Sequence, residues 1–387
     1  MKLNGVLLTA AGCLGAIVVL GQAPAPAPQT GPGVQALQDA KYADWIMTKC
    51  KVPPQRGGGA GRGAAAAPAR GEAPRGEAAR GNARGNARGP LEPRDYTVKE
   101  IPGVIAAGQK WKSVWTGMGN NADGIIATKD GGILAAQNTN SDVMKIDKDD
   151  KVSFPYKDTN TGGAVSMNKK GAMFLVSRGL PQKILQLEPK RRVFADMYNG
   201  EPLDCAGGLV NDLSAASNGG VYFTMGSLYY ANPQGVITKQ GTVTGTNGII
   251  LSGDEKTLYV TGRIASSPAA PAPGTPAAPG TGGSIIAYDV KPDGSLANER
   301  QFATVGGDGT TIDSMGRLYS TGGGGIQVIA PDGKFLGEIP APVSNGLITA
   351  AFSGPDKKTL YAVANNQVYD EIFKIQMISQ GFKGRAK

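Results

Sequence analysis

Two aspartates and two asparagines stand at the head of similar phrases along the chain, and together they could form an oxygen-ligand metal site. Asp123, Asn211, Asn247 and Asp308 each precede a short apolar run, a turn and a second run suited to a β-strand. Two carboxylates and two amide oxygens are hard ligands, which suit calcium, magnesium or manganese better than zinc. Asn and Asp also begin strands because they favour turns. Spacing alone leaves both interpretations open.

The phrases that follow these residues predict the elements that would position them. The phrases begin at residues 123, 164, 211, 247, 308 and 345, so they are spaced by 41, 47, 36, 61 and 37 residues, and the copy at 164 lacks a leading polar residue. Repeats of roughly 40–50 residues are typical of propeller blades. Strand segments such as VYFT, TLYVT and RLYST are β-branched and aromatic, and each follows a turn. We therefore expect an all-β, six-bladed propeller over residues 95–387, whose equivalent positions converge on one channel.

A propeller must also protect its sheet edges, so an early strand should complete the last blade. Residues 96–104, YTVKEIPGV, precede the first phrase and are the candidate for this closing strand. The long spacing before residue 308 contains a Pro- and Ala-rich stretch at 265–283, which we expect to loop out of the fourth blade without regular structure.

The chain contains no histidine. This absence excludes Ser-His-Asp triads, histidine general bases, c-type haem attachment and most catalytic zinc sites. The four glycines at 322–325 lie between two expected strands, so they predict a turn and not a phosphate-binding loop. Any catalysis would therefore rest on carboxylates, amides and a metal ion.

Four phrases taken together resemble the regucalcin/gluconolactonase family, also called the senescence-marker-protein-like family. They are VNDLSAASNGGVYFT, TNGIILSGDEKTLYVTG, GDGTTIDSMGRLYSTGGGGIQVIAPDGKFLGEIP and AFSGPDKKTLYAVA, and the resemblance covers residues 95–376. It implies a six-bladed propeller, many of whose members hydrolyse lactones with one divalent metal in the channel. It also implies that Asp123, Asn247 and Asp308 are metal ligands. Asn211 would lie beside the metal, often through water, and would orient the substrate.

Two residues depart from the pattern of that family. The family carries a Glu where this chain has Asp123, which is one methylene shorter, so the metal geometry would have to shift or include a water. Sugar-lactone members carry an Arg two residues before the third-phrase Asn, where this chain has Leu209. An aldonolactone is therefore a poor expectation. Leu209 and Met225, together with Val210, predict a less polar substrate-binding region.

The resemblance and the residues together favour an exported, metal-dependent hydrolase of lactones or related esters. One divalent ion would polarise the ester carbonyl, with calcium expected first and manganese, magnesium or zinc as alternatives. Asp308 is the catalytic candidate, because its carboxylate could take a proton from the attacking water. The alternative is a non-catalytic propeller of the cell envelope that binds a ligand or a protein, since a fold does not fix a function.

The N-terminus predicts export. Lys2 precedes the apolar run VLLTAAGCLGAIVVLG, so residues 1–23 read as a secretory signal. An uncleaved membrane anchor and a lipoprotein signal at Cys13 are alternatives. Each interpretation places the propeller in the periplasm or outside the cell, and membrane contact would occur only through this segment.

Residues 24–94 form a low-complexity linker with room for a short helix at 35–50. From 51 to 94 it carries nine basic and three acidic residues, so most of the net charge of +9 lies here. This linker could act as a solvated tether or make weak contact with envelope polyanions, and the sequence does not choose between the two. Nucleic-acid binding is not expected, because no aromatic residues interleave the arginines. Cys50 and Cys205 remain beyond the signal, and an oxidising compartment would permit but not require their pairing.

Overall fold

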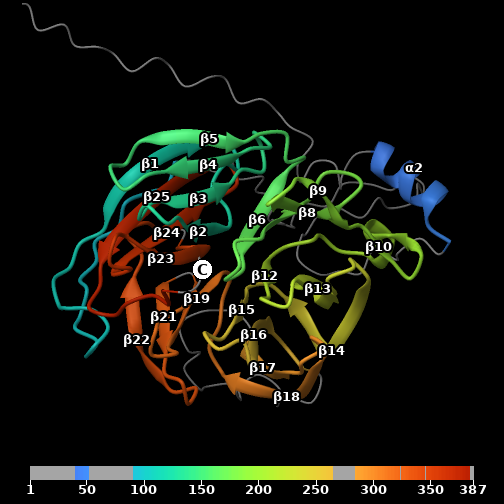
Figure 1. Ribbon diagram of the computed structural model, residues 1–387. Helices are drawn as coiled ribbons and strands as arrows, with labels where there is room; N and C mark the ends of the chain where they lie inside the picture. The colour runs from blue at the N-terminus through green and yellow to red at the C-terminus, as the bar shows by residue number, and fades with distance from the viewer. Residues whose placement is uncertain (1–39, 52–89, 265–283, 323, 345, 384–387) are drawn as a thin grey trace, which may run out of the picture.

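The computed structural model describes residues 40–51, 90–264, 284–322, 324–344 and 346–383, and it folds the repeats into a ring of six antiparallel sheets (Figure 1). The predicted six-bladed propeller is confirmed. The expected signal at 1–23, most of the linker, the stretch at 265–283 and residue 345, which heads the last phrase, lie outside the described residues.

The first three blades follow the chain in order. Blade one contains β2 (Ile125–Ala127), β3 (Ile133–Ala136), β4 (Val143–Ile146) and β5 (Val152–Tyr156). Blade two contains β6 (Gly162–Met167), β7 (Met173–Ser177), β8 (Lys183–Glu188) and β9 (Arg192–Ala195). Blade three contains β12 (Leu213–Ala215), β13 (Val221–Ala231) and β14 (Ile237–Thr246).

The remaining blades complete the ring. Blade four contains β15 (Ile249–Leu251), β16 (Thr257–Gly262), β17 (Ser284–Val290) and β18 (Leu296–Ala303). Blade five contains β19 (Thr310–Ile312), β20 (Leu318–Thr321), β21 (Gly325–Ile329) and β22 (Phe335–Pro340). Blade six contains β23 (Thr349–Ser353), β24 (Thr359–Asn365), β25 (Tyr369–Gln376) and β1 (Lys112–Met118).

The ring is closed by β1, which pairs antiparallel with β25 along the edge of blade six. The expectation that residues 96–104 form the closing strand was wrong. A turn at Pro102 and Gly103 interrupts that segment, and Ile101 pairs with Ile105 across it. Its apolar side chains, Val98 among them, instead join a buried cluster with residues of blades five and six. The segment therefore covers the propeller and does not extend a sheet.

One helix and one disulfide lie beside blades two and three. Helix α2 (Ala40–Lys49) falls within the stretch where a short helix was expected, and none of the helices in the described ranges is long and apolar enough to cross a membrane. Cys50 follows the helix and is disulfide-bonded to Cys205, with 5.4 Å between the Cα atoms. Cys205 lies in η1 (Leu203–Ala206), which follows the hairpin of β10 (Met197–Tyr198) and β11 (Glu201–Pro202).

The hydrophobic core lies mainly between neighbouring blades. The inner strands β2, β12, β15 and β19 are buried along their whole length, whereas the outer strand β5 is mostly exposed. An inner strand that packs on both faces needs apolar side chains at successive positions. The runs IIA and IIL meet this requirement, and all three residues of each are buried. The short inner strands fix the residues that precede them at the mouth of the channel.

Candidate functional site

Four polar residues occupy the same position in four blades. Asp123, Asn211, Asn247 and Asp308 each lie two residues before the first residue of an inner strand. In each case the backbone N–H donates to a carbonyl of the second strand of the blade; the acceptors are Ala136, Thr224, Thr261 and Thr321. Because the backbone is held in the same way four times, the four side chains start from equivalent points around the channel.

These four side chains line one small pocket, together with residues of blades two, three, five and six. The pocket has a volume of about 10 Å³, which is close to the space that a single water molecule needs. Glycines let the neighbouring blades approach this closely. A Cβ on Gly248 would lie 2.0 Å from the carbonyl oxygen of Asp308, and one on Gly309 would lie 2.7 Å from Oγ1 of Thr349.

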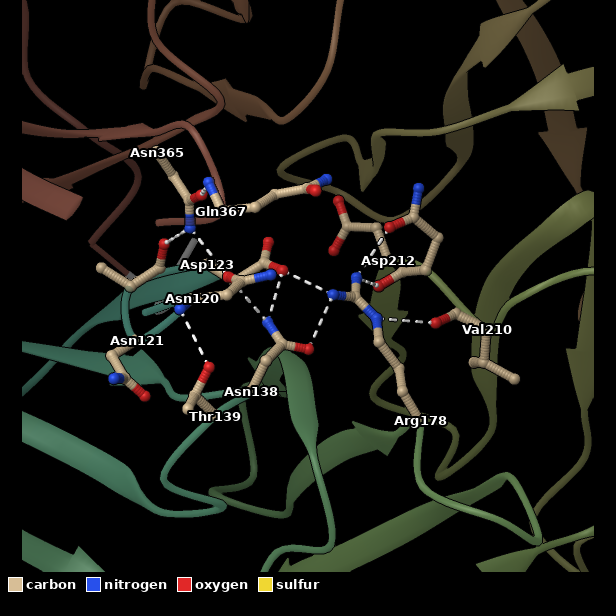
Figure 2. A network of polar contacts seen from close by, with 12 residues as sticks. Asn120, Asn121, Asp123, Asn138, Thr139, Arg178, Val210, Asp212, Asn365 and Gln367 are labelled. Carbon is tan, nitrogen blue, oxygen red and sulfur yellow. Dashed lines mark hydrogen bonds and ion pairs between the residues drawn. The ribbon is translucent and has the colours of Figure 1, made fainter. Parts of the chain in front are cut away.

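An arginine from blade two reaches into this cluster. Arg178 follows β7 directly, and its side chain is only 7% exposed. Nη1 donates to Oδ2 of Asp123 at 2.5 Å and to Oδ1 of Asn138 at 3.0 Å. Nη2 donates to Oδ1 of Asn211 at 2.7 Å, and Nε donates to the carbonyl of Val210 at 3.0 Å. Figure 2 shows this side chain directed at Asp123 and Asn138, with the carbonyl of Val210 beside Nε.

Blade two makes room for this arginine. The repeated phrase of this blade, which begins at Ala164, has no leading polar residue, and Gly163 just before it lies where the guanidinium passes. A Cβ on Gly163 would lie 2.2 Å from Cζ and from Nε of Arg178. The blade that departs from the repeated pattern thus contributes a cation from the end of its second strand.

The arginine also orders the two amides of the site. Because Oδ1 of Asn211 accepts from Arg178, its Nδ2 turns away and donates to Oδ1 of Asn247 at 2.6 Å. Asp123 and Asn211 therefore bond the guanidinium directly, and Asn247 is linked to it through the amide of Asn211. Three of the four residues expected to bind metal belong to this one network.

A second group of amides supports Asp123 from the other side. Asn138 donates to Oδ2 of Asp123 at 2.8 Å, and Asn120 accepts from Asn138 and from Asn365 of blade six. Beneath them, Asp370 is almost fully buried on β25 and accepts from the backbone N–H of Asn121 at 2.5 Å. Burial raises the pKa of Asp370 to about 8, and the charge of Asp123 adds to that effect. Asp370 is therefore a weaker acid than an exposed aspartate.

The two apolar residues expected to contact substrate are placed differently. Met225 is 2% exposed and packs in a cluster with Phe223 and Tyr229 between blades two and three. Neither Met225 nor Leu209 lines the pocket that the four polar residues share. Sequence reasoning missed Arg178, although the phrase without a polar head was a signal that blade two differs.

The donor set has the chemistry that a divalent metal requires. Two carboxylates and two amides surround a pocket of ion size, and all their donor atoms facing a metal would be hard oxygens. Within the described ranges no group of three or more His, Cys, Asp or Glu residues is arranged to hold a metal, so a metal here would depend on the asparagine oxygens. The residues thus fit a hard cation, and Arg178 already contacts two of them, Asp123 and Asn211.

Comparisons with known proteins agree with this fold. The family model of the SMP-30/gluconolactonase/LRE-like region matches residues 159–366. A gluconolactonase of Zymomonas mobilis subsp. mobilis is 25% identical over 246 residues, which are 55% of this chain and 63% of that protein. The match therefore spans less than two thirds of that curated relative.

Solved structures of other propellers are also similar. A gluconolactonase from Xanthomonas campestris is 20% identical, with a TM-score of 0.58 over 75% of this chain and 98% of that one. Regucalcin from Agrobacterium tumefaciens, a calcium-binding protein, is 13% identical, with a TM-score of 0.51 over 71% of this chain and 98% of that one. At these identities the two structures support the fold.

Proposed function

The chain belongs to the SMP-30/gluconolactonase/LRE-like family, and on that premise we propose that it is a metal-dependent hydrolase of lactones or related carboxylic esters. The observation that carries the proposal is the convergence of Asp123, Asn211, Asn247 and Asp308 on one pocket at the channel mouth. Asp123, Asn247 and Asp308 would hold one divalent ion, calcium first, and Asn211 would lie beside it. When bound, such an ion supplies charge that stabilises the oxyanion formed from the ester carbonyl.

The chain's own residues would carry the proton transfer. Asp308 accepts the proton from a water whose oxygen attacks the carbonyl carbon, and it returns that proton to the leaving oxygen as the ester C–O bond breaks. Asp308 is half-buried and lines the pocket, so its carboxylate is accessible to water. Leu209 stands where the sugar-lactone pattern has an arginine, which favours a lactone or ester less polar than an aldonolactone.

A hydrolysis screen tests this proposal. The chelated protein is assayed with lactones and aryl esters before and after addition of calcium, manganese, magnesium or zinc. We expect activity to need added metal, and Asp308→Asn to abolish hydrolysis, because an amide cannot accept the proton. Asp332→Asn makes the same change on an exposed turn of the same blade and should keep full activity. Full hydrolysis by Asp308→Asn would contradict the assigned role.

A non-catalytic binding propeller is the second candidate, and Arg178 is the observation that favours it. Its guanidinium already balances the charge of Asp123 without any added ion. If chelation and metal changed neither stability nor hydrolysis, the cluster would be a structural network and the binding function would be preferred.

We also propose that the protein works outside the cytoplasm. The disulfide between Cys50 and Cys205 supports this location, because such bonds persist in oxidising compartments. Fractionation of cells that express the full chain, followed by thiol labelling, would test it. Recovery of reduced protein in the cytoplasm would contradict export.

A further inference from the structure

We propose that Arg178 is a built-in competitor of the divalent metal, so that the guanidinium and the ion are alternative occupants of Asp123 and Asn211. This inference rests on the proposed function, because it concerns the same site. It assigns to Arg178 control over how tightly, and therefore at what free-ion concentration, the site is loaded.

The contacts of Arg178 carry the argument. The guanidinium takes Oδ2 of Asp123 and Oδ1 of Asn211 with separate nitrogens, at 2.5 and 2.7 Å. Those are the oxygens of two residues that the family pattern brings to a metal. A divalent ion bound to the same oxygens at about 2.3–2.6 Å would lie beside a cation that is 7% exposed and poorly screened by water.

The competition extends to a third residue. With Oδ1 of Asn211 turned to the guanidinium, its Nδ2 donates to Oδ1 of Asn247. An ion placed between Asn211 and Asn247 competes with this donor for Oδ1 of Asn247, and Asn211 can turn its own oxygen to the ion only when Arg178 releases it. A metal therefore has to overcome one ion pair and a linked pair of amide hydrogen bonds.

The chain is shaped to admit this side chain. Gly163 leaves the space for the guanidinium, and the carbonyls of Val210 and Asn211 accept from Nε and Nη2 at 3.0 and 2.9 Å. A guanidinium presents a planar fork of donors that fits several acceptors at once. Arg178 is thus held beside the pocket by five hydrogen bonds to side chains and backbone carbonyls.

Calorimetric titration of the chelated full-length protein with calcium, and separately with manganese, tests the competition. Arg178→Gln removes the charge, and Gly163→Ala expels the guanidinium while keeping it on the chain. Both variants should bind metal more tightly than the wild type, by about 5- to 150-fold, the usual range for a coupling between two sites. Arg317→Gln breaks a matched buried pair with Asp313 outside the pocket and should leave the affinity within about twofold of the wild type.

The outcomes separate the inference from the function on which it rests. If the wild type binds metal and Arg178→Gln binds it no more tightly, the competition is refuted and the hydrolase proposal stands. If no variant binds either ion, the metal requirement fails and the inference fails with it. A measurement on the folded wild type covers the case in which variants do not fold. The Nε–H signal of Arg178, assigned by its absence in Arg178→Lys, should shift and lose exchange protection as metal binds; an unchanged signal in the loaded protein would overturn the proposal.

Discussion

Removing the guanidinium of Arg178 should cost the metal-free protein a large share of its stability. Arg178→Met keeps most of the apolar stem but leaves Asp123 without its ion pair. Breaking a buried pair by removing one partner costs about 3–5 kcal/mol. Asp123 is 21% exposed, so water partly solvates the abandoned carboxylate. We therefore expect the lower end of that range, about 3 kcal/mol.

An exposed pair provides the comparison. Arg300 and Asp289 lie 2.8 Å apart with side chains 46% and 45% exposed, and such pairs contribute about 0–1 kcal/mol. Urea unfolding followed by tryptophan fluorescence, in a chelator, gives the free energy of unfolding of the wild type, Arg178→Met and Arg300→Met. Equal losses of unfolding free energy in the two variants would refute the reasoning, because the pair at Arg178 would then be as well solvated as an exposed pair.

A double-mutant cycle isolates the pair itself. Asp123→Asn removes the carboxylate and leaves the guanidinium, so the double variant should lose less free energy than the sum of the two single changes. Residues in direct contact commonly show interaction energies of about 0.5–3 kcal/mol. Strict additivity would mean that Arg178 stabilises the fold only through its other partners.

Two further predictions concern the disulfide and a buried acid. The bond between Cys50 and Cys205 closes a loop of 155 residues, so the chain-entropy treatment gives it about 5 kcal/mol; replacing both cysteines with serine should lower the melting temperature, and a reductant should lower that of the wild type but not that of the variant. Asp370 has a folded pKa raised to about 8 by burial, whereas its unfolded pKa is about 4. The folded state therefore holds one extra proton between about pH 4 and 8, and stability should fall with rising pH by about 1.4 kcal/mol per unit from this group. Asp370→Asn removes that contribution, and parallel pH profiles for the two proteins would contradict the assignment.

Much of the fold could be predicted because each blade repeats the same local signals. A turn residue, an apolar triplet and a β-branched run determine where an inner strand begins, as at Asn247. Equivalent starts in a radial repeat lead to one channel. This logic places the polar heads together without any knowledge of distant contacts.

The features that were missed depend on contacts between distant segments or on which face a side chain takes. Arg178 lies outside the repeated phrase, and its partners Asp123 and Asn211 are 55 and 33 residues away. Met225 follows Phe223 by two residues on β13, so both side chains point to the same buried face. That alternation was visible in the sequence and would have assigned Met225 to the core.

The closing strand could not be chosen from strand propensity alone, because residues 96–104 and β1 both carry apolar side chains.

Blade two explains why the charge of the site cannot be inferred from the repeat alone. The polar residues that lead the repeated phrases include two carboxylates, Asp123 and Asp308. The repeat alone therefore predicts a site that needs an external cation. The blade with no polar head supplies Arg178, which halves that negative charge from within the chain. A site balanced in this way folds without metal, and it can take up metal only as far as the ion outcompetes the guanidinium.

The same residue, Arg178, therefore connects the stability of the metal-free propeller to the metal affinity of the site. A change at Arg178 should move the two in opposite directions: it should lower stability in chelator and raise the gain in melting temperature on adding calcium. If both moved in the same direction, Arg178 would be a support of the metal site and not its competitor.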